Sequence, residues 1–105
     1  MSEVREINDL NFETEVLQSD TPFLLDFSAA WCGPCKALKP VLEALASEQA
    51  GLLKVGKIDV DLSPDVATRF GIRGMPTLVV FRAGSEVRRR VGAGSKSALL
   101  ALIQK

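Results

Sequence analysis

Continuous apolar segments alternate along the chain with segments in which apolar residues recur every third or fourth position. A run such as Phe23 to Phe27 is typical of a strand buried on both faces, and the wider spacing is typical of an amphipathic helix. These patterns predict strands over residues 3–7, 23–27, 53–60, 77–81 and 86–91. They predict helices over residues 9–18, from Pro34 to Gly51, from Ser63 to Gly71 and from Ser95 onward. The expected order is therefore βαβαβαββα.

Polar residues and prolines mark the starts of these helices. Asn8-Asp9 offers a cap for the helix over 9–18, and Ser63 offers one for the helix that Pro64 opens. Pro34 also fits a first helical turn, where its missing N–H would have had no partner.

The alternation of strands and helices favours parallel pairing through right-handed crossovers. The last two strands are joined by a short turn at residues 82–85, which predicts an antiparallel hairpin. We therefore predict an α/β fold with a mixed central five-stranded sheet and helices on both faces. Nothing in the sequence reads as a linker or an internal repeat, so residues 1–105 are predicted to form one domain.

Composition narrows the classes of function. The 105 residues contain two cysteines and no histidine, which excludes Ser-His and Cys-His catalytic pairs and a four-ligand zinc site within one chain. Thirteen basic and thirteen acidic residues cancel, which argues against a nucleic-acid partner. The arginine run at 88–90 is interpreted as charge protecting an edge strand from unwanted pairing.

The predicted cellular location rests on the lack of a membrane-spanning apolar run and of a signal-peptide pattern in this sequence. No apolar run approaches the ~18–20 residues of a membrane helix, and the first fifteen residues show no signal-peptide pattern. We therefore expect a cytoplasmic protein with no membrane partner. In that compartment a lone cysteine pair is more often catalytic than structural.

The motif Trp31-Cys32-Gly33-Pro34-Cys35 lies where a buried strand gives way to a helix. A thiol at a helix N-terminus has a lowered pKa, so Cys32 is the candidate nucleophile, and Cys35 is expected one turn on and less exposed. This arrangement favours thiol–disulfide exchange. An inert disulfide and a metal half-site completed in a dimer are the alternatives.

The chain resembles the thioredoxin family in three segments. Residues 26–36 are similar to its active-site segment, and residues 71–77 and 91–93 to its second and third signatures. The resemblance implies the thioredoxin fold and a cofactor-free, metal-free monomer that reduces protein disulfides and is itself re-reduced by a thioredoxin reductase. Ser28 departs from the family, which commonly carries a tryptophan there.

Asp26 is an acid within a run of four large hydrophobic residues. Burial would raise its pKa, whereas an acid at the strand end could instead reach solvent. The resemblance implies that Asp26 is a proton acceptor for Cys35 and that Lys57 assists it; an ordinary strand-end lysine is the alternative for Lys57.

The resemblance also implies a cis Met75–Pro76 bond beside the cysteines and pairing of the Met75 backbone with an extended substrate. The predicted substrate-binding residues share small or apolar character: Trp31, Gly33, Pro34, Gly74, Met75, Pro76, Gly92 and Ala93.

Three rival functions remain open at this point. The fold could serve as a binding module without turnover, as a dimer-bridging metal or iron–sulfur scaffold, or as an exported oxidase or isomerase. Pro34 between the cysteines matches the reducing members of the family.

Overall fold

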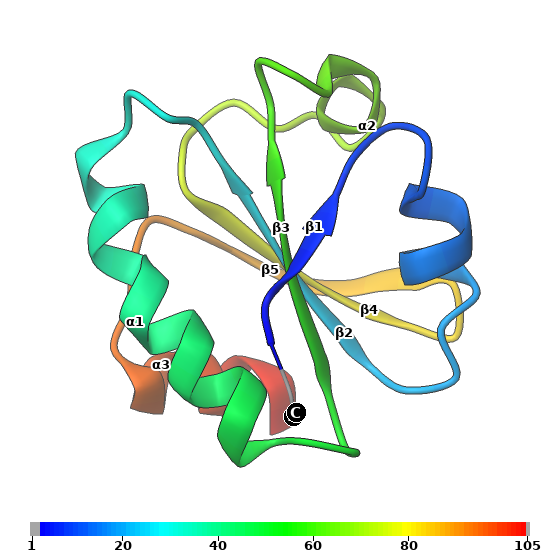
Figure 1. Ribbon diagram of the computed structural model, residues 1–105, viewed down its shortest axis with the longest axis vertical. Helices are drawn as coiled ribbons and strands as arrows, with labels where there is room; N and C mark the ends of the chain where they lie inside the picture. The colour runs from blue at the N-terminus through cyan, green and yellow to red at the C-terminus, as the bar shows by residue number, and fades with distance from the viewer. Residues whose placement is uncertain (1–2, 105) are drawn as a thin grey trace.

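The computed structural model describes residues 3–104, so residues 1, 2 and 105 of the predicted domain lie outside the described part. One sheet forms the centre of the molecule (Figure 1). Its strands are β1 (Arg5–Ile7), β2 (Phe23–Ser28), β3 (Lys54–Asp59), β4 (Thr77–Arg82) and β5 (Ser85–Val91).

The strands lie in the order β1-β3-β2-β4-β5, which makes β2 the central strand. β3 is parallel to both β1 and β2, whereas β4 is antiparallel to both β2 and β5. The parallel neighbours β2 and β3 are joined by a helical crossover, and the antiparallel strands β4 and β5 by a tight turn. The predicted mixed five-stranded sheet is confirmed.

Within residues 3–104, four helical segments cover the two faces of this sheet: η1 (Glu13–Leu17), α1 (Gly33–Glu48), α2 (Pro64–Arg69) and α3 (Lys96–Gln104). Figure 1 shows α1 and α3 together on one face, and η1 and α2 on the other. Within the described part of the chain, no helix has the length and apolar character needed to span a bilayer.

The first helical segment differs from its prediction over 9–18. Asn8 Oδ1 accepts hydrogen bonds from the backbone N–H groups of Leu10 and Asn11, at 2.8 and 2.9 Å. This side chain competes with the helix for the backbone, so residues 8–11 form a turn first. The following segment is a single π-type stretch that begins only at Glu13.

The cap predicted for α2 was also wrong in detail. Ser63 occupies the N-cap position of α2, but its side chain makes no capping bond. The cap comes instead from Asp9, whose two carboxylate oxygens accept from the N–H groups of Asp65 and Val66 at 3.2 and 3.0 Å. An acid far earlier in the sequence therefore satisfies the free N–H groups at the start of α2.

The central strand β2 buries side chains on both of its faces. Phe23, Leu25 and Phe27 join the apolar cluster under η1 and α2. Leu24 joins the cluster under α1 and α3, and Asp26 follows it on that same face because strand side chains alternate. This alternation places a carboxyl group in the interior beside α1.

Candidate active site

The two cysteines form a disulfide at the N-terminus of α1, with their Cα atoms 5.3 Å apart. Cys32 is the N-cap residue, and its sulfur accepts a hydrogen bond from the Cys35 N–H at 3.2 Å. Pro34 lies in the first turn, as predicted. The helix dipole and this N–H donor both favour a negative charge on the Cys32 sulfur once the disulfide is reduced.

The expectation that Cys35 would be less exposed than Cys32 is wrong for this disulfide form. Cys32 is 4% exposed and Cys35 7% exposed. Both residues pack with Ala29, and Val60 and Met75 close over the same cluster. Both cysteines are therefore buried among these apolar neighbours.

The Met75–Pro76 peptide bond is cis, as the resemblance implied. Pro76 is buried, and its carbonyl accepts a hydrogen bond of 2.7 Å from the Gly92 N–H. The Thr77 hydroxyl donates to the Gly74 carbonyl, which closes the turn before β4. These bonds hold the segments over residues 71–77 and 91–93 together next to the cysteine cluster.

The residues predicted to bind substrate lie around the disulfide with different degrees of exposure. Trp31, Gly33, Pro34 and Ala93 are exposed, Gly74, Met75 and Gly92 are partly exposed, and Pro76 is buried. Pro76 therefore shapes this surface from beneath and presents little area to a partner.

The Trp31 ring is exposed but held in place. Its indole N–H donates to Asp61 Oδ2 at 2.8 Å. The sequence analysis did not single out Asp61, which follows β3 in a loop and carries no motif of its own. Asp61 meets Trp31 because β3 ends beside the active-site loop. The hydrophobic periodicity of the sequence does not reveal that these two segments are neighbours.

Asp26 is 2% exposed, so the alternative of a solvent-reaching acid is wrong. Among the residues that the structure describes, Asp26 Oδ1 has no hydrogen-bond partner. Burial raises the pKa of this carboxyl to about 7, and the positive charge of Lys57 opposes the rise. A carboxyl that titrates near neutrality can exchange a proton under physiological conditions.

Lys57 lies directly beside Asp26, because the two are register partners on β3 and β2. Its ammonium nitrogen makes an ion pair with Glu6 Oε1 at 3.4 Å, on the outer strand β1. Sequence reasoning missed Glu6, which looked like an ordinary polar position of an edge strand. Only the strand order reveals that Glu6 and Asp26 flank the same lysine.

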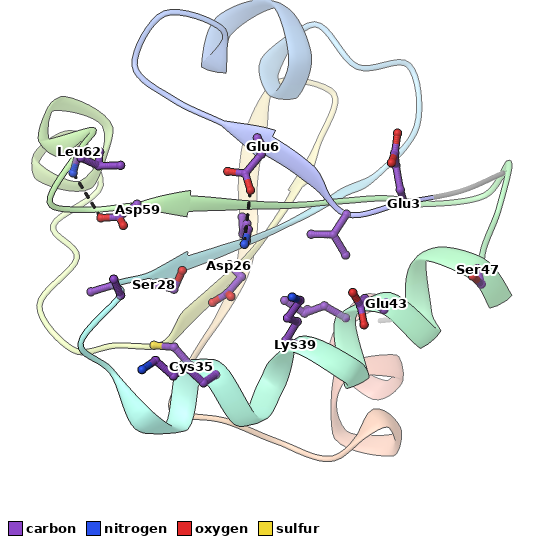
Figure 2. A pocket seen from close by; sticks show the side chains of 16 residues that line it. Glu3, Glu6, Asp26, Ser28, Cys35, Lys39, Glu43, Ser47, Asp59 and Leu62 are labelled. Atoms are coloured by element: carbon purple, nitrogen blue, oxygen red, sulfur yellow. Dashed lines mark hydrogen bonds and ion pairs between the residues drawn. The ribbon is translucent and has the colours of Figure 1, made fainter.

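A pocket of about 770 Å³ opens between α1 and the strands β1 and β3, and both Asp26 and Cys35 line it. Figure 2 shows Asp26 and Cys35 facing this space from β2 and α1. We call it the Asp26 pocket. Ser28 also lines it, at the position where the sequence departs from the family pattern. The pocket gives water a route to the buried carboxyl and to Cys35.

The site contains no arrangement typical of a metal centre. Among residues 3–104, no group of three or more cysteine, aspartate or glutamate side chains is placed to hold a metal ion. The two sulfurs lie with the buried Asp26 carboxyl and the Lys57 ammonium group, and other acids and lysines line the same pocket. That set suits proton and disulfide exchange.

Comparison with known proteins agrees with this chemistry. The family model described as Thioredoxin matches residues 3–105. A thioredoxin of Haemophilus influenzae is 48% identical over 105 residues, covering 100% of this chain and 98% of that protein. A thioredoxin of Mycobacterium tuberculosis is 50% identical over 94 residues, covering 90% of this chain and 81% of that protein.

A longer relative is a bifunctional thioredoxin reductase/thioredoxin of Mycobacterium leprae. It is 50% identical over 95 residues, which is 90% of this chain but only 21% of that protein. The shorter relatives therefore match nearly end to end, and the longer one in a single part. Together with the fold and the Cys32–Cys35 pair, these matches show that the chain belongs to the thioredoxin family of protein disulfide oxidoreductases.

Proposed function

We propose that this member of the family reduces protein disulfides with Cys32 as the nucleophile and Cys35 as the resolving cysteine. The observation that carries the assignment is the hydrogen bond from the Cys35 N–H to the Cys32 sulfur at the start of α1. A backbone donor and the helix terminus both act on Cys32, so its thiolate is the better stabilised of the two.

In the first step, the Cys32 thiolate attacks one sulfur of a substrate disulfide. A bond forms between the Cys32 sulfur and that substrate sulfur, and the substrate S–S bond breaks. The second substrate sulfur leaves as a thiolate and takes a proton from solvent.

In the second step, the Cys35 thiol gives its proton to the Asp26 carboxylate, assisted electrostatically by Lys57. The Cys35 thiolate then attacks the Cys32 sulfur, closes the intramolecular disulfide and expels the remaining substrate thiolate, which is protonated. Two enzyme thiols are oxidised and one substrate disulfide is reduced to two thiols. The shared Asp26 pocket and the pKa of Asp26 near 7 support this assignment, because such an acid is partly ionised at neutral pH.

Substrate docks, in this proposal, on the surface around Cys32. The exposed Trp31 ring and the small residues Gly33, Gly74 and Gly92 leave room for a partner backbone. The backbone of Met75 pairs with an extended segment of the substrate, as an added strand would. The packing of Met75 against the cysteine cluster supports this role, because it places the docking segment beside the reacting sulfurs.

The proposal includes a thioredoxin reductase as the electron donor. The fused reductase and thioredoxin in the Mycobacterium leprae relative supports this pairing for related proteins. We further propose a single domain over residues 1–105 that acts as a monomer in the cytoplasm, where a disulfide reductase is kept in its dithiol form.

Two cysteine variants test the assignment. Reduced Cys35→Ser incubated with insulin is expected to accumulate a one-to-one mixed disulfide on Cys32, visible by mass spectrometry without reductant. Cys32→Ser is expected to form no such adduct and to reduce insulin about 100-fold more slowly or worse. Adduct formation by Cys32→Ser alone would reverse the two roles. A wild-type protein that failed to accelerate insulin reduction would favour a binding module.

A further inference from the structure

Three charged residues form a row across one face of the sheet. Glu6 of β1 is the register partner of Lys57 on β3, and Lys57 is the register partner of Asp26 on β2. Register partners on neighbouring strands project from the same face, so an acid, a base and an acid follow one another toward the interior. The side chains of Glu6 and Lys57 are 76% and 41% exposed, whereas Asp26 is buried.

The lysine in the middle of this row is turned toward the outer acid. Lys57 Nζ is 3.4 Å from Glu6 Oε1, while Asp26 Oδ1 has no hydrogen-bond partner among the described residues. Figure 2 shows the Glu6 carboxylate directed into the pocket above Asp26, and Glu3 turned away from it. The ammonium group therefore contacts Glu6 and acts on Asp26 only through its field.

We propose that Glu6 is a positioning residue for disulfide reduction: it holds the Lys57 ammonium at the outer side of the Asp26 pocket and so leaves the Asp26 carboxylate unpaired and able to take the proton of Cys35. This inference rests on the acceptor role of Asp26 in the proposed function. A carboxylate that was paired directly with the lysine would hold a proton far less readily.

Other charged groups also line the Asp26 pocket, and they contribute to the electrostatic field at its carboxyl group. They come from α1, from β3 and from the segment before β1: Lys36, Lys39, Glu43, Asp59 and Glu3, with the Cys35 thiol in the reduced form. On the remaining side, β4 places the apolar Leu78 opposite Asp26. The register neighbours of Asp26 are Lys57 and Leu78, and only Lys57 carries a charge, so the position of Lys57 matters most.

Removing the charge of Glu6 acts on Asp26 in two ways that have the same sign. A nearby negative charge disappears, and Lys57 is released to approach Asp26. Both changes favour the ionised carboxylate and lower the pKa of Asp26. If Glu6 instead kept Lys57 close to Asp26, its removal would free the lysine into solvent and raise that pKa.

The direct test is to titrate Asp26 by carboxyl-carbon NMR in the oxidised protein, where the cysteines do not titrate. In Glu6→Gln the midpoint is expected to fall by a few tenths of a pH unit, as befits a partly exposed ion pair. Glu6→Asp keeps the charge and is expected to stay near wild type. Glu3→Gln is the matched control, because it removes an acid of the same pocket that points away from Asp26, and its shift is expected to be smaller.

Salt provides a second readout that a structural effect would not reproduce. At about 1 M salt the screening length is about 3 Å, so the Glu6→Gln shift is expected to shrink toward zero. A Glu6→Gln midpoint that is unchanged or higher than that of wild type overturns the inference.

Kinetics separate this inference from the function on which it rests. The resolution step, measured in single-turnover pH profiles of the reduced protein, is expected to shift in Glu6→Gln in parallel with the NMR midpoint. If the midpoint moves and the profile does not, the acceptor role of Asp26 fails while the placement of Lys57 by Glu6 stands. If neither moves, the inference about Glu6 fails by itself.

Discussion

The two faces of β2 differ in polarity: one is wholly apolar, and the other contains a buried carboxyl group. On one face, Phe23, Leu25 and Phe27 pack into a cluster that η1 and α2 close completely. On the other, Leu24 is followed by the unpaired Asp26 and then by Ser28, at the edge of a pocket open to water. Apolar clusters on both faces stabilise the fold, and this stability offsets the cost of keeping a carboxyl group inside the second face.

The closed face contains three aromatic rings that meet edge to face. Phe81 of β4 lies 5.7 Å from Phe12 and 5.3 Å from Phe70, between ring centroids. Such contacts add to the burial of the rings themselves. The comparison therefore predicts losses of stability without changes of chemistry on this face, and changes of chemistry around Asp26 on the other.

The largest effect is expected for Phe81→Ala. Phe81 is fully buried, so its truncation leaves a cavity and is expected to cost about 3–5 kcal/mol of the free energy of unfolding. Urea denaturation measures the loss. Insulin reduction per folded molecule is expected to stay unchanged, because the ring packs on the face away from the Asp26 pocket. A large fall in that specific activity would show that the two faces are not separate.

Asp26→Asn is expected to have the next largest effect, and the size of that effect depends on pH. Burial raises the pKa of Asp26 in the folded protein from its ordinary 3.8 to about 7, so the unfolded state loses its proton first as the pH rises. Between these two pKa values the free energy of unfolding falls as the pH rises. Above the higher pKa the folded protein bears the full cost of a buried, ionised carboxylate. The variant is therefore expected to be more stable than wild type by roughly 2–4 kcal/mol at pH 9.

Low pH provides the control for this measurement. Below the lower pKa both states of wild type carry a protonated Asp26, so the advantage of the variant is expected to vanish there. Urea denaturation across the pH range follows the difference. An advantage that stayed constant with pH would contradict burial of a titrating carboxyl as its cause.

A smaller effect is expected for Gly56→Ala, which probes how tightly the closed face is packed. A Cβ at Gly56 would lie 2.9 Å from two ring carbons of Phe23 and 3.0 Å from Ile7. The buried ring cannot move aside freely, so the cost is expected to be about 1–3 kcal/mol. Gly33→Ala is the matched control, since a Cβ there meets nothing within 4 Å. Equal stabilities of the two variants, by urea denaturation, would mean that the closed face yields easily.

Much of the fold could be predicted because each element carries its own periodic pattern. The apolar run of β2, the spacing along α1 and the turn before β5 each depend on neighbours in sequence. The chemistry of the cysteine motif was readable for the same reason, because both cysteines and the helix start lie within a few residues.

The parts that the sequence analysis missed depend on contacts between distant segments. Glu6 meets Lys57 only because β1 lies next to β3, and Asp61 meets Trp31 only because a loop after β3 reaches the active-site segment. The relative burial of the cysteines likewise depends on Met75 and Val60 folding over them. The local pattern of polar and apolar residues does not indicate which distant segments lie in contact.

The cap that Asp9 provides for α2 links the start of the chain to a helix more than fifty residues later. During synthesis the N-terminal segments leave the ribosome first. The acceptor for α2, and the strands β1, β2 and β3 that hold it in place, have therefore all been made before Pro64 emerges. Asp9 can therefore cap α2 before β4, β5 and α3 have been made, so the helix does not depend on the rest of the chain for its cap.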